Sequence, residues 1–158
     1  MFKTKKLIIS VIVLSVAVLI GFLSINCKAQ TKSENYAVSS WEGDYTLLAR
    51  LVAGEAEGEP YLGQVGVAAV IINRTKHPKF PTTIADVIYQ PGAFESVSNG
   101  LIWSRYPSRN NFDAARQAMS GWDPTYGSVF FWNPYKSVSP WIWSRSIVTR
   151  IGRHVFAK

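Results

Sequence analysis

The stretch LLARLVAGEAEGEP, residues 47–60, predicts a helix that carries a carboxylate on its apolar face. At about 100° per residue, Leu51, Val52 and Glu55 fall on one stripe of that helix. A carboxylate in this position is expected to be buried or to line a cleft, where desolvation raises its pKa and favours the protonated form. A carboxyl group that stays protonated near neutral pH is a candidate general acid.

The neighbouring acids differ from Glu55 in this pattern. Glu57 falls on the opposite side of the helix and is expected to be a solvated charge. Glu59 stands between Gly58 and Pro60, two residues that end helices, so it is expected in the exit turn. A simpler interpretation of Glu55 stays open, in which it caps the helix end or pairs with an arginine.

The first 27 residues are typical of a targeting segment. Lys3, Lys5 and Lys6 precede an uncharged apolar run over residues 7–25. This run suits a cleaved signal peptide or an N-terminal membrane anchor, and the anchor is favoured because the run is long enough to span a bilayer. The basic cluster should stay inside, so we expect the rest of the chain to be exported to the cell envelope.

Residues 28–43 are polar and predict a flexible tether, and residues 44–158 predict one catalytic domain. Because Cys27 is the single cysteine, no disulfide is expected in that domain. From residue 41 onward, the chain contains 12 Lys and Arg and 9 Asp and Glu, a net charge of about +3. This balance is too mild to indicate nucleic-acid binding, and it suits an anionic cell-wall polymer or a membrane surface.

The apolar patterning predicts helices first and short strands last, which is typical of a mostly helical α+β domain. Asp44 is expected to cap the first helix. Thr83 and Asp86 are expected to form a capping box at the start of a short helix. The expected helices span residues 44–56, 62–75, 83–89 and 111–120, and the expected extended pieces span residues 128–132, 141–143 and 153–156.

Several chemistries are poorly supported by the residues present. His77 and His154 are far apart in the chain and no HExxH helix occurs, so we expect neither a metal nor another cofactor, and His154 is interpreted as structural. No GxSxG elbow or Gly-rich phosphate loop is present, and Cys27 belongs to the targeting segment. Acid catalysis on a glycosidic bond therefore remains.

Glycosidases usually use two catalytic carboxylates. In this chain a second carboxylate is harder to identify than Glu55. Asp123 is a candidate, although Asp before Pro is often a turn former. Without a second carboxylate, the 6-hydroxyl of a muramic acid unit can act as the internal nucleophile and close a 1,6-anhydro ring. One Glu then first donates a proton to the leaving oxygen and next accepts one from that hydroxyl.

Eight short motifs in fixed order carry a family resemblance. They are GEAEGEP at 54–60, GQV at 63–65, NR at 73–74, QPGAF at 90–94, GWDPT at 121–125, NP at 133–134, WIWSR at 141–145 and GRHVF at 152–156. Together they resemble the SleB-type cell wall hydrolases, the spore-cortex-lytic enzymes and their relatives. The resemblance implies a lysozyme-like or lytic-transglycosylase-like fold, cleavage of peptidoglycan between muramic acid and glucosamine, and Glu55 as the catalytic acid.

The chain departs from that family in two respects. The family commonly has Arg where this chain has Glu57, which makes the field near Glu55 more negative. Spore-cortex members often carry a separate wall-binding domain, whereas this chain is expected to rely on its anchor or a protein partner. Both spore cortex and vegetative wall stay open as substrates.

Other motif residues are candidates for holding sugar, with packing or turn geometry as the alternative for each: Gln90, Phe94, Trp122, Asp123, Asn133 and Trp143. Asn73 and Arg74 are expected to cap the second helix, and Trp141 with Arg145 to form a structural stack. Three rival functions remain open: a non-catalytic wall-binding module, a muramidase that hydrolyses with water, and an assembly protein that acts only with a partner.

Overall fold

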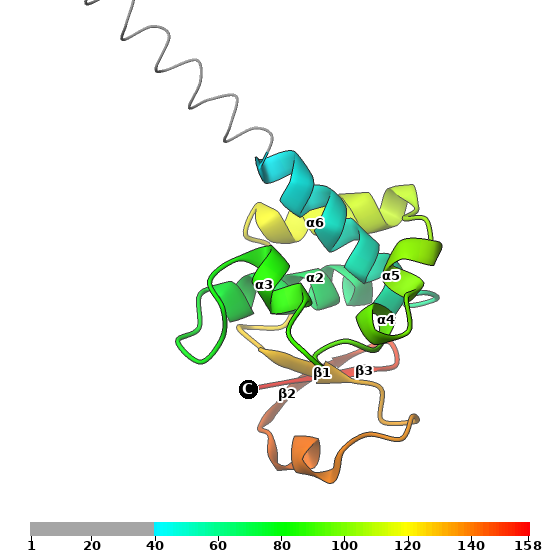
Figure 1. The fold of residues 1–158 in the computed structure, drawn as a ribbon. Coiled ribbons are helices and arrows are strands. Elements are labelled where there is room, and N and C mark those ends of the chain that lie inside the picture. The colour runs from blue at the N-terminus through cyan, green and yellow to red at the C-terminus, as the bar shows by residue number, and fades with distance from the viewer. Residues whose placement is uncertain (1–39) are drawn as a thin grey trace, which may run out of the picture. The chain divides into compact units, whose positions relative to one another are not determined.

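The computed structural model describes residues 40–158, in which the helices come first and a small sheet last (Figure 1). Residues 42–158 form one compact unit. The expected targeting segment and most of the expected tether lie outside the described residues. None of the helices within residues 40–158 has the length and apolar character needed to cross a bilayer.

The described part of the first helix spans residues 40–55, and five labelled helices follow. They are α2 (Tyr61–Thr75), α3 (Ile84–Ile88), α4 (Glu95–Ser98), α5 (Leu101–Ser104) and α6 (Arg109–Met119). Since the first helix already includes residues 40–43, the prediction that Asp44 caps it is wrong. Thr83 does cap α3, because its side chain accepts a hydrogen bond from the backbone N–H of Asp86.

Helix α2 is central, as its nearly uninterrupted apolar sequence predicted. All residues from Gly63 to Ile71 are buried, and the helix packs against α6, α3 and the sheet. Gly66 allows the sheet to approach, because a Cβ there would lie 2.8 Å from the Cζ atom of Phe156. The expected helix at 111–120 is also confirmed as α6, which begins after a capping box at Ser108 and buries Ala114, Ala115 and Ala118.

The sheet has three antiparallel strands in the order β1-β3-β2. They are β1 (Phe130–Trp132), β2 (Ile147–Ile151) and β3 (His154–Ala157). Phe131 pairs with Phe156, and Ile151 pairs with His154 across the tight turn between β2 and β3. The α+β class is confirmed, and the two expected strands near residues 130 and 155 are present, while β2 was not predicted.

One predicted extended piece is wrong, and two short helices were not predicted. Residues 141–143 belong to a 3₁₀ helix, η1 (Pro140–Ser144), whose first residue is a proline. Proline has the fixed φ that suits a helix start, and this preference overrides the strand propensity of the tryptophans. Helices α4 and α5 are single turns, too short to show a helical period in the sequence.

Candidate active site

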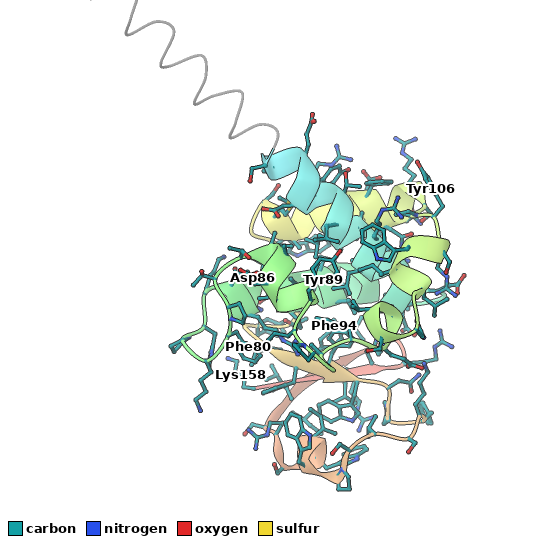
Figure 2. The ribbon with its side chains drawn as sticks, viewed as in Figure 1. Phe80, Asp86, Tyr89, Phe94, Tyr106 and Lys158 are labelled. Atoms are coloured by element: carbon teal, nitrogen blue, oxygen red, sulfur yellow. The ribbon has the colours of Figure 1, made fainter. Side chains whose placement is uncertain are left out.

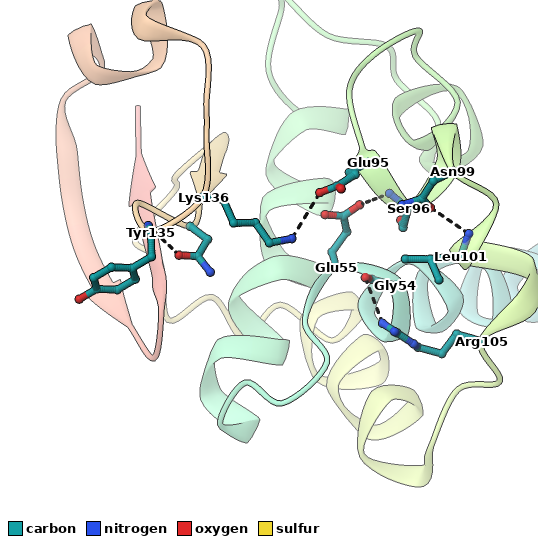
Figure 3. Close-up of polar contacts among 10 residues, drawn as sticks. Gly54, Glu55, Glu95, Ser96, Asn99, Leu101, Arg105, Tyr135 and Lys136 are labelled. Atoms are coloured by element: carbon teal, nitrogen blue, oxygen red, sulfur yellow. Dashed lines mark hydrogen bonds and ion pairs between the residues drawn. The ribbon is translucent and has the colours of Figure 1, made fainter.

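Glu55 is the last helical residue of the segment 40–55, and its side chain is half-buried. Its Oε1 atom accepts a hydrogen bond of 2.8 Å from the backbone N–H of Ser96, in α4 (Figure 3). The stripe of Leu51, Val52 and Glu55 explains this position, because the two apolar residues are fully buried while Glu55 reaches the edge of the core. Glu55 also lines a groove, which confirms the expectation that this carboxylate is buried or in a cleft.

Gly54 makes the contact between the helix end and α4 possible. A Cβ at residue 54 would lie 2.5 Å from the Cβ of Ser96 and 2.8 Å from its Oγ, distances that real side chains do not adopt. Ser96 is itself buried at 1% exposure. The absence of a side chain at Gly54 therefore lets the backbone of α4 lie close enough to hold the Glu55 carboxylate.

Glu55 lines a groove of about 230 Å³. One wall is the helix end and the turn after it, and the others come from α5 with Arg105, from the loop after β1, and from the turn between β2 and β3. Asn133 and Lys136 reach the groove from the loop after β1. The groove lining is more polar than the core beside it, as a site for a hydroxyl-rich substrate requires.

Glu59 also lines the groove but is fixed in place. Its side chain is 2% exposed and forms an ion pair with Arg153, whose Nε lies 2.7 Å from Oε1. The backbone N–H of Arg153 donates to Oε2 over 2.9 Å. The exit turn predicted for Glu59 is confirmed, and its carboxylate serves to join that turn to the start of β3.

Glu57 is exposed, as predicted, and it forms an ion pair with Arg105. Arg105 also donates hydrogen bonds to the backbone carbonyls of Ala53 and Gly54. Among the carboxylates of the described residues that line this groove, Glu55 is therefore the one without an ion pair. It is the acid that remains free to exchange a proton with a bound molecule.

His154 lines the same groove and was interpreted from the sequence as structural. It is 6% exposed and packs edge-on against Phe131 at 5.3 Å between ring centroids. Its buried Nδ1 has no hydrogen-bond partner among the described residues. Burial lowers the pKa of His154, against the opposing influence of the Glu59 carboxylate, so the ring is neutral near pH 7.

Asp123 does not line the groove of Glu55. Its Oδ1 accepts hydrogen bonds from the N–H and hydroxyl of Thr125, and its Oδ2 accepts from Asn73 Nδ2 and Gly127 N–H. Burial acts to raise the pKa of Asp123, but these hydrogen bonds outweigh it and lower the pKa. The arrangement supports the turn-forming interpretation rather than a second catalytic carboxylate.

The prediction that Asn73 and Arg74 cap α2 is wrong. Asn73 binds Asp123 and the carbonyl of Ser128, and Arg74 Nε donates to the carbonyl of Val129 over 2.8 Å. Both residues join α2 to the segment that leads into β1. Burial lowers the pKa of Arg74 to about 10, and its guanidinium still carries its charge at neutral pH.

The candidate sugar-binding residues are distributed over different places. Asn133 lines the groove of Glu55, whereas Gln90 lines a separate pocket of about 270 Å³ that Trp141 also lines. Phe94 is 4% exposed and stacks on Phe131, so it is a core residue. Figure 2 shows Phe94 between the helices and the sheet.

Trp122 and Trp143 are both exposed, but they line neither the groove of Glu55 nor the pocket of Gln90. Trp122 contacts Tyr61, and Trp143 packs edge-on against Trp132. The expected stack of Trp141 and Arg145 is present, with the guanidinium 5.4 Å from the ring centroid. Within residues 40–158, no group of three or more His, Cys, Asp or Glu is placed to hold a metal ion.

Comparison with known proteins gives consistent matches. The family described as Cell Wall Hydrolase matches residues 58–157, which begin three residues after Glu55. The spore cortex-lytic enzyme of Bacillus cereus is 42% identical over 138 residues, which cover 87% of this chain and 53% of that protein. The chain spans about half the length of the curated spore cortex-lytic enzymes it matches.

Two solved structures are also similar. The catalytic domain of the Bacillus cereus SleB protein has a TM-score of 0.69 and 44% identity, covering 74% of this chain and 91% of that one. The catalytic domain of the germination-specific lytic transglycosylase SleB from Bacillus anthracis has the same TM-score and identity, covering 73% and 93%.

Proposed function

Because the chain belongs to the cell wall hydrolase family, we propose that it cleaves peptidoglycan glycan strands between muramic acid and glucosamine, with Glu55 as general acid and then general base. The observation that carries this proposal is the environment of Glu55. It is the groove-lining carboxylate without an ion pair, and a backbone N–H fixes its orientation.

The reaction we propose is that of a lytic transglycosylase. Glu55 donates its proton to the glycosidic oxygen as the bond from that oxygen to C1 of muramic acid breaks. The resulting carboxylate accepts the proton of the muramic acid 6-hydroxyl, whose oxygen bonds to C1 and closes the 1,6-anhydro ring. Glu55 regains its proton, so one carboxyl group completes the cycle.

The distribution of acids supports this mechanism over one with two catalytic carboxylates. Glu57 and Glu59 are paired with Arg105 and Arg153, and the hydrogen bonds of Asp123 occupy both of its oxygens. The similarity to a solved lytic transglycosylase domain gives further support. A muramidase that activates water is the alternative within the same site.

Mass spectrometry of digested peptidoglycan tests the proposal. The purified protein is incubated with cell wall material and the soluble fragments are identified, with heat-treated protein as control. We expect fragments that end in 1,6-anhydro-muramic acid. Reducing muramic acid ends would indicate hydrolysis by water, and binding without release of fragments would indicate a wall-binding module.

The proposal includes a location at the cell envelope. The basic residues before the apolar run at 7–25 support export with the catalytic domain outside the cytoplasm. Fractionation of cells that produce the full chain, followed by protease treatment of intact protoplasts, tests this. Digestion of the domain without lysis is the expected result, and full protection would contradict it.

A further inference from the structure

Three cationic side chains line the groove beside Glu55, and two of them are fixed. Arg105 pairs with Glu57 and donates to the carbonyl of Ala53. Arg153 pairs with Glu59 and donates to the carbonyl of Glu57. Each guanidinium thus has several partners within the protein, and neither is available to a ligand without breaking them.

Lys136 differs from the two arginines. Its ion-pair partner is Glu95, at 3.4 Å between Nζ and Oε2, and the two side chains are 65% and 69% exposed. An ion pair this exposed contributes little to stability, because water solvates both charges almost as well. The ammonium can therefore exchange Glu95 for another anion with little loss of protein stability.

The position of this pair relates it to the catalytic residue. Glu95 directly precedes Ser96, the residue whose N–H holds Glu55. Lys136 lies on the opposite wall, in a turn where its N–H donates to the carbonyl of Asn133. Figure 3 shows the Lys136 and Glu95 side chains meeting across the space beside the Glu55 carboxylate.

From this arrangement we infer that Lys136 is a specificity-determining residue that binds a carboxylate of the glycan, taking it in place of Glu95 when substrate occupies the groove. Muramic acid carries such a group on its lactyl ether or on the peptide attached there. The inference rests on the proposed function and deepens it, since it names the substrate feature recognised beside the scissile bond. Glu95 holds the ammonium in position until the substrate arrives.

Steady-state kinetics of the full chain on soluble peptidoglycan strands tests the inference. We compare wild type, Lys136→Met, Lys136→Arg and Lys76→Met, the last removing an exposed lysine that does not line the groove. For Lys136→Met we expect KM to rise about tenfold with kcat within twofold, the effect of losing one charge-assisted hydrogen bond. Lys136→Arg should restore most of the affinity, and Lys76→Met should match wild type.

Amidation of the substrate carboxylates provides the decisive control. On amidated strands, wild type and Lys136→Met should have the same KM. A comparison of intact strands with strands stripped of peptide shows where the recognised carboxylate lies. The rise in KM caused by Lys136→Met should persist on the strands that carry this carboxylate. Glu95→Gln should lower KM or leave it within twofold, because the substrate no longer competes with Glu95.

The inference is overturned if Lys136→Met, with an unchanged melting temperature, keeps the wild-type KM on carboxylate-bearing strands. It is also overturned if Lys136→Met raises KM as much on amidated strands as on carboxylate-bearing ones, or if Glu95→Gln raises KM several-fold. If wild type releases no fragments at all, the proposed function fails instead. Fragment release by wild type therefore distinguishes failure of the proposed function from failure of the inference about Lys136.

Discussion

Glu59 and Arg153 are joined by two hydrogen bonds, from the backbone N–H of Arg153 at 2.9 Å and from its Nε at 2.7 Å. The residues are 94 positions apart in the chain. The pair connects the turn after the first helix to the start of β3. Two walls of the groove therefore depend on one buried carboxylate that lies four residues from Glu55.

Replacing this carboxylate should affect stability more than chemistry. Glu59→Gln keeps the shape of the side chain but removes the charge that holds Arg153, so we expect a loss of about 1–3 kcal/mol in the free energy of unfolding. Glu57→Gln is the matched control, because the Glu57 side chain is 63% exposed, and it should change stability by less than about 0.5 kcal/mol. Urea denaturation measures both, and equal stabilities of the two variants would contradict the structural role of Glu59.

Replacing two glycines of the first helix by alanine, one at a time, should change the stability of the protein in opposite directions. A Cβ at Gly54 meets Ser96 at 2.5 Å, so Gly54→Ala should displace α4, lower stability by about 1–3 kcal/mol and reduce activity. A Cβ at Gly43 meets nothing within 4 Å, and Gly43→Ala should raise stability by about 0.5–1 kcal/mol. Thermal melts and fragment release test the pair, and full activity of Gly54→Ala would contradict the role given to the Ser96 contact.

Asp123→Asn should weaken the protein without abolishing catalysis. Since hydrogen bonds lower the folded-state pKa of Asp123 below its ordinary value of 3.8, its contribution to stability is full above that value and is lost as pH falls through the folded pKa. We expect Asp123→Asn to be less stable than wild type by about 1–3 kcal/mol at pH 7, and this difference to shrink in strong acid. Loss of fragment release at unchanged stability would instead indicate a second catalytic carboxylate.

His154 should make stability depend on pH in the mildly acidic range. Burial lowers its folded-state pKa below the ordinary 6.5, so between these values the unfolded chain binds more protons than the folded one. The free energy of unfolding then rises with pH up to about 6.5 and falls as the pH is lowered through this range. His154→Gln should flatten this slope and His77→Gln should keep it, as urea denaturation at several pH values will show; an unchanged slope in His154→Gln would contradict a buried neutral ring.

The sequence was sufficient to predict where the Glu55 side chain lies, because the pattern that places it is local. A helical period of 3.6 residues places Glu55 beside Leu51 and Val52, and the helix continues through all three. The same reasoning predicted α2 and α6, which are long enough to show a period. These two helices and the end of the first one position most of the core behind the site.

The remaining parts of the site depend on contacts between distant segments. Nothing near Glu59 in the sequence indicates Arg153, and α4, which supplies the N–H that binds Glu55, is a single turn. Phe94 was a candidate for sugar binding because it was predicted to lie in a loop at the edge of the cleft, yet it is buried against Phe131. Burial of a loop residue is decided by what packs over it, and here that is a strand formed much later in the chain.

Whether Glu55 transfers the proton is tested most directly by the rate of fragment release by Glu55→Gln. Glutamine keeps the size of the side chain and an oxygen that can accept the Ser96 N–H, but it has no proton to donate as an acid. The expected result is a loss of roughly 10²-fold or more in rate at an unchanged melting temperature. A folded Glu55→Gln variant that releases fragments at the wild-type rate would contradict the role of Glu55 as general acid and base.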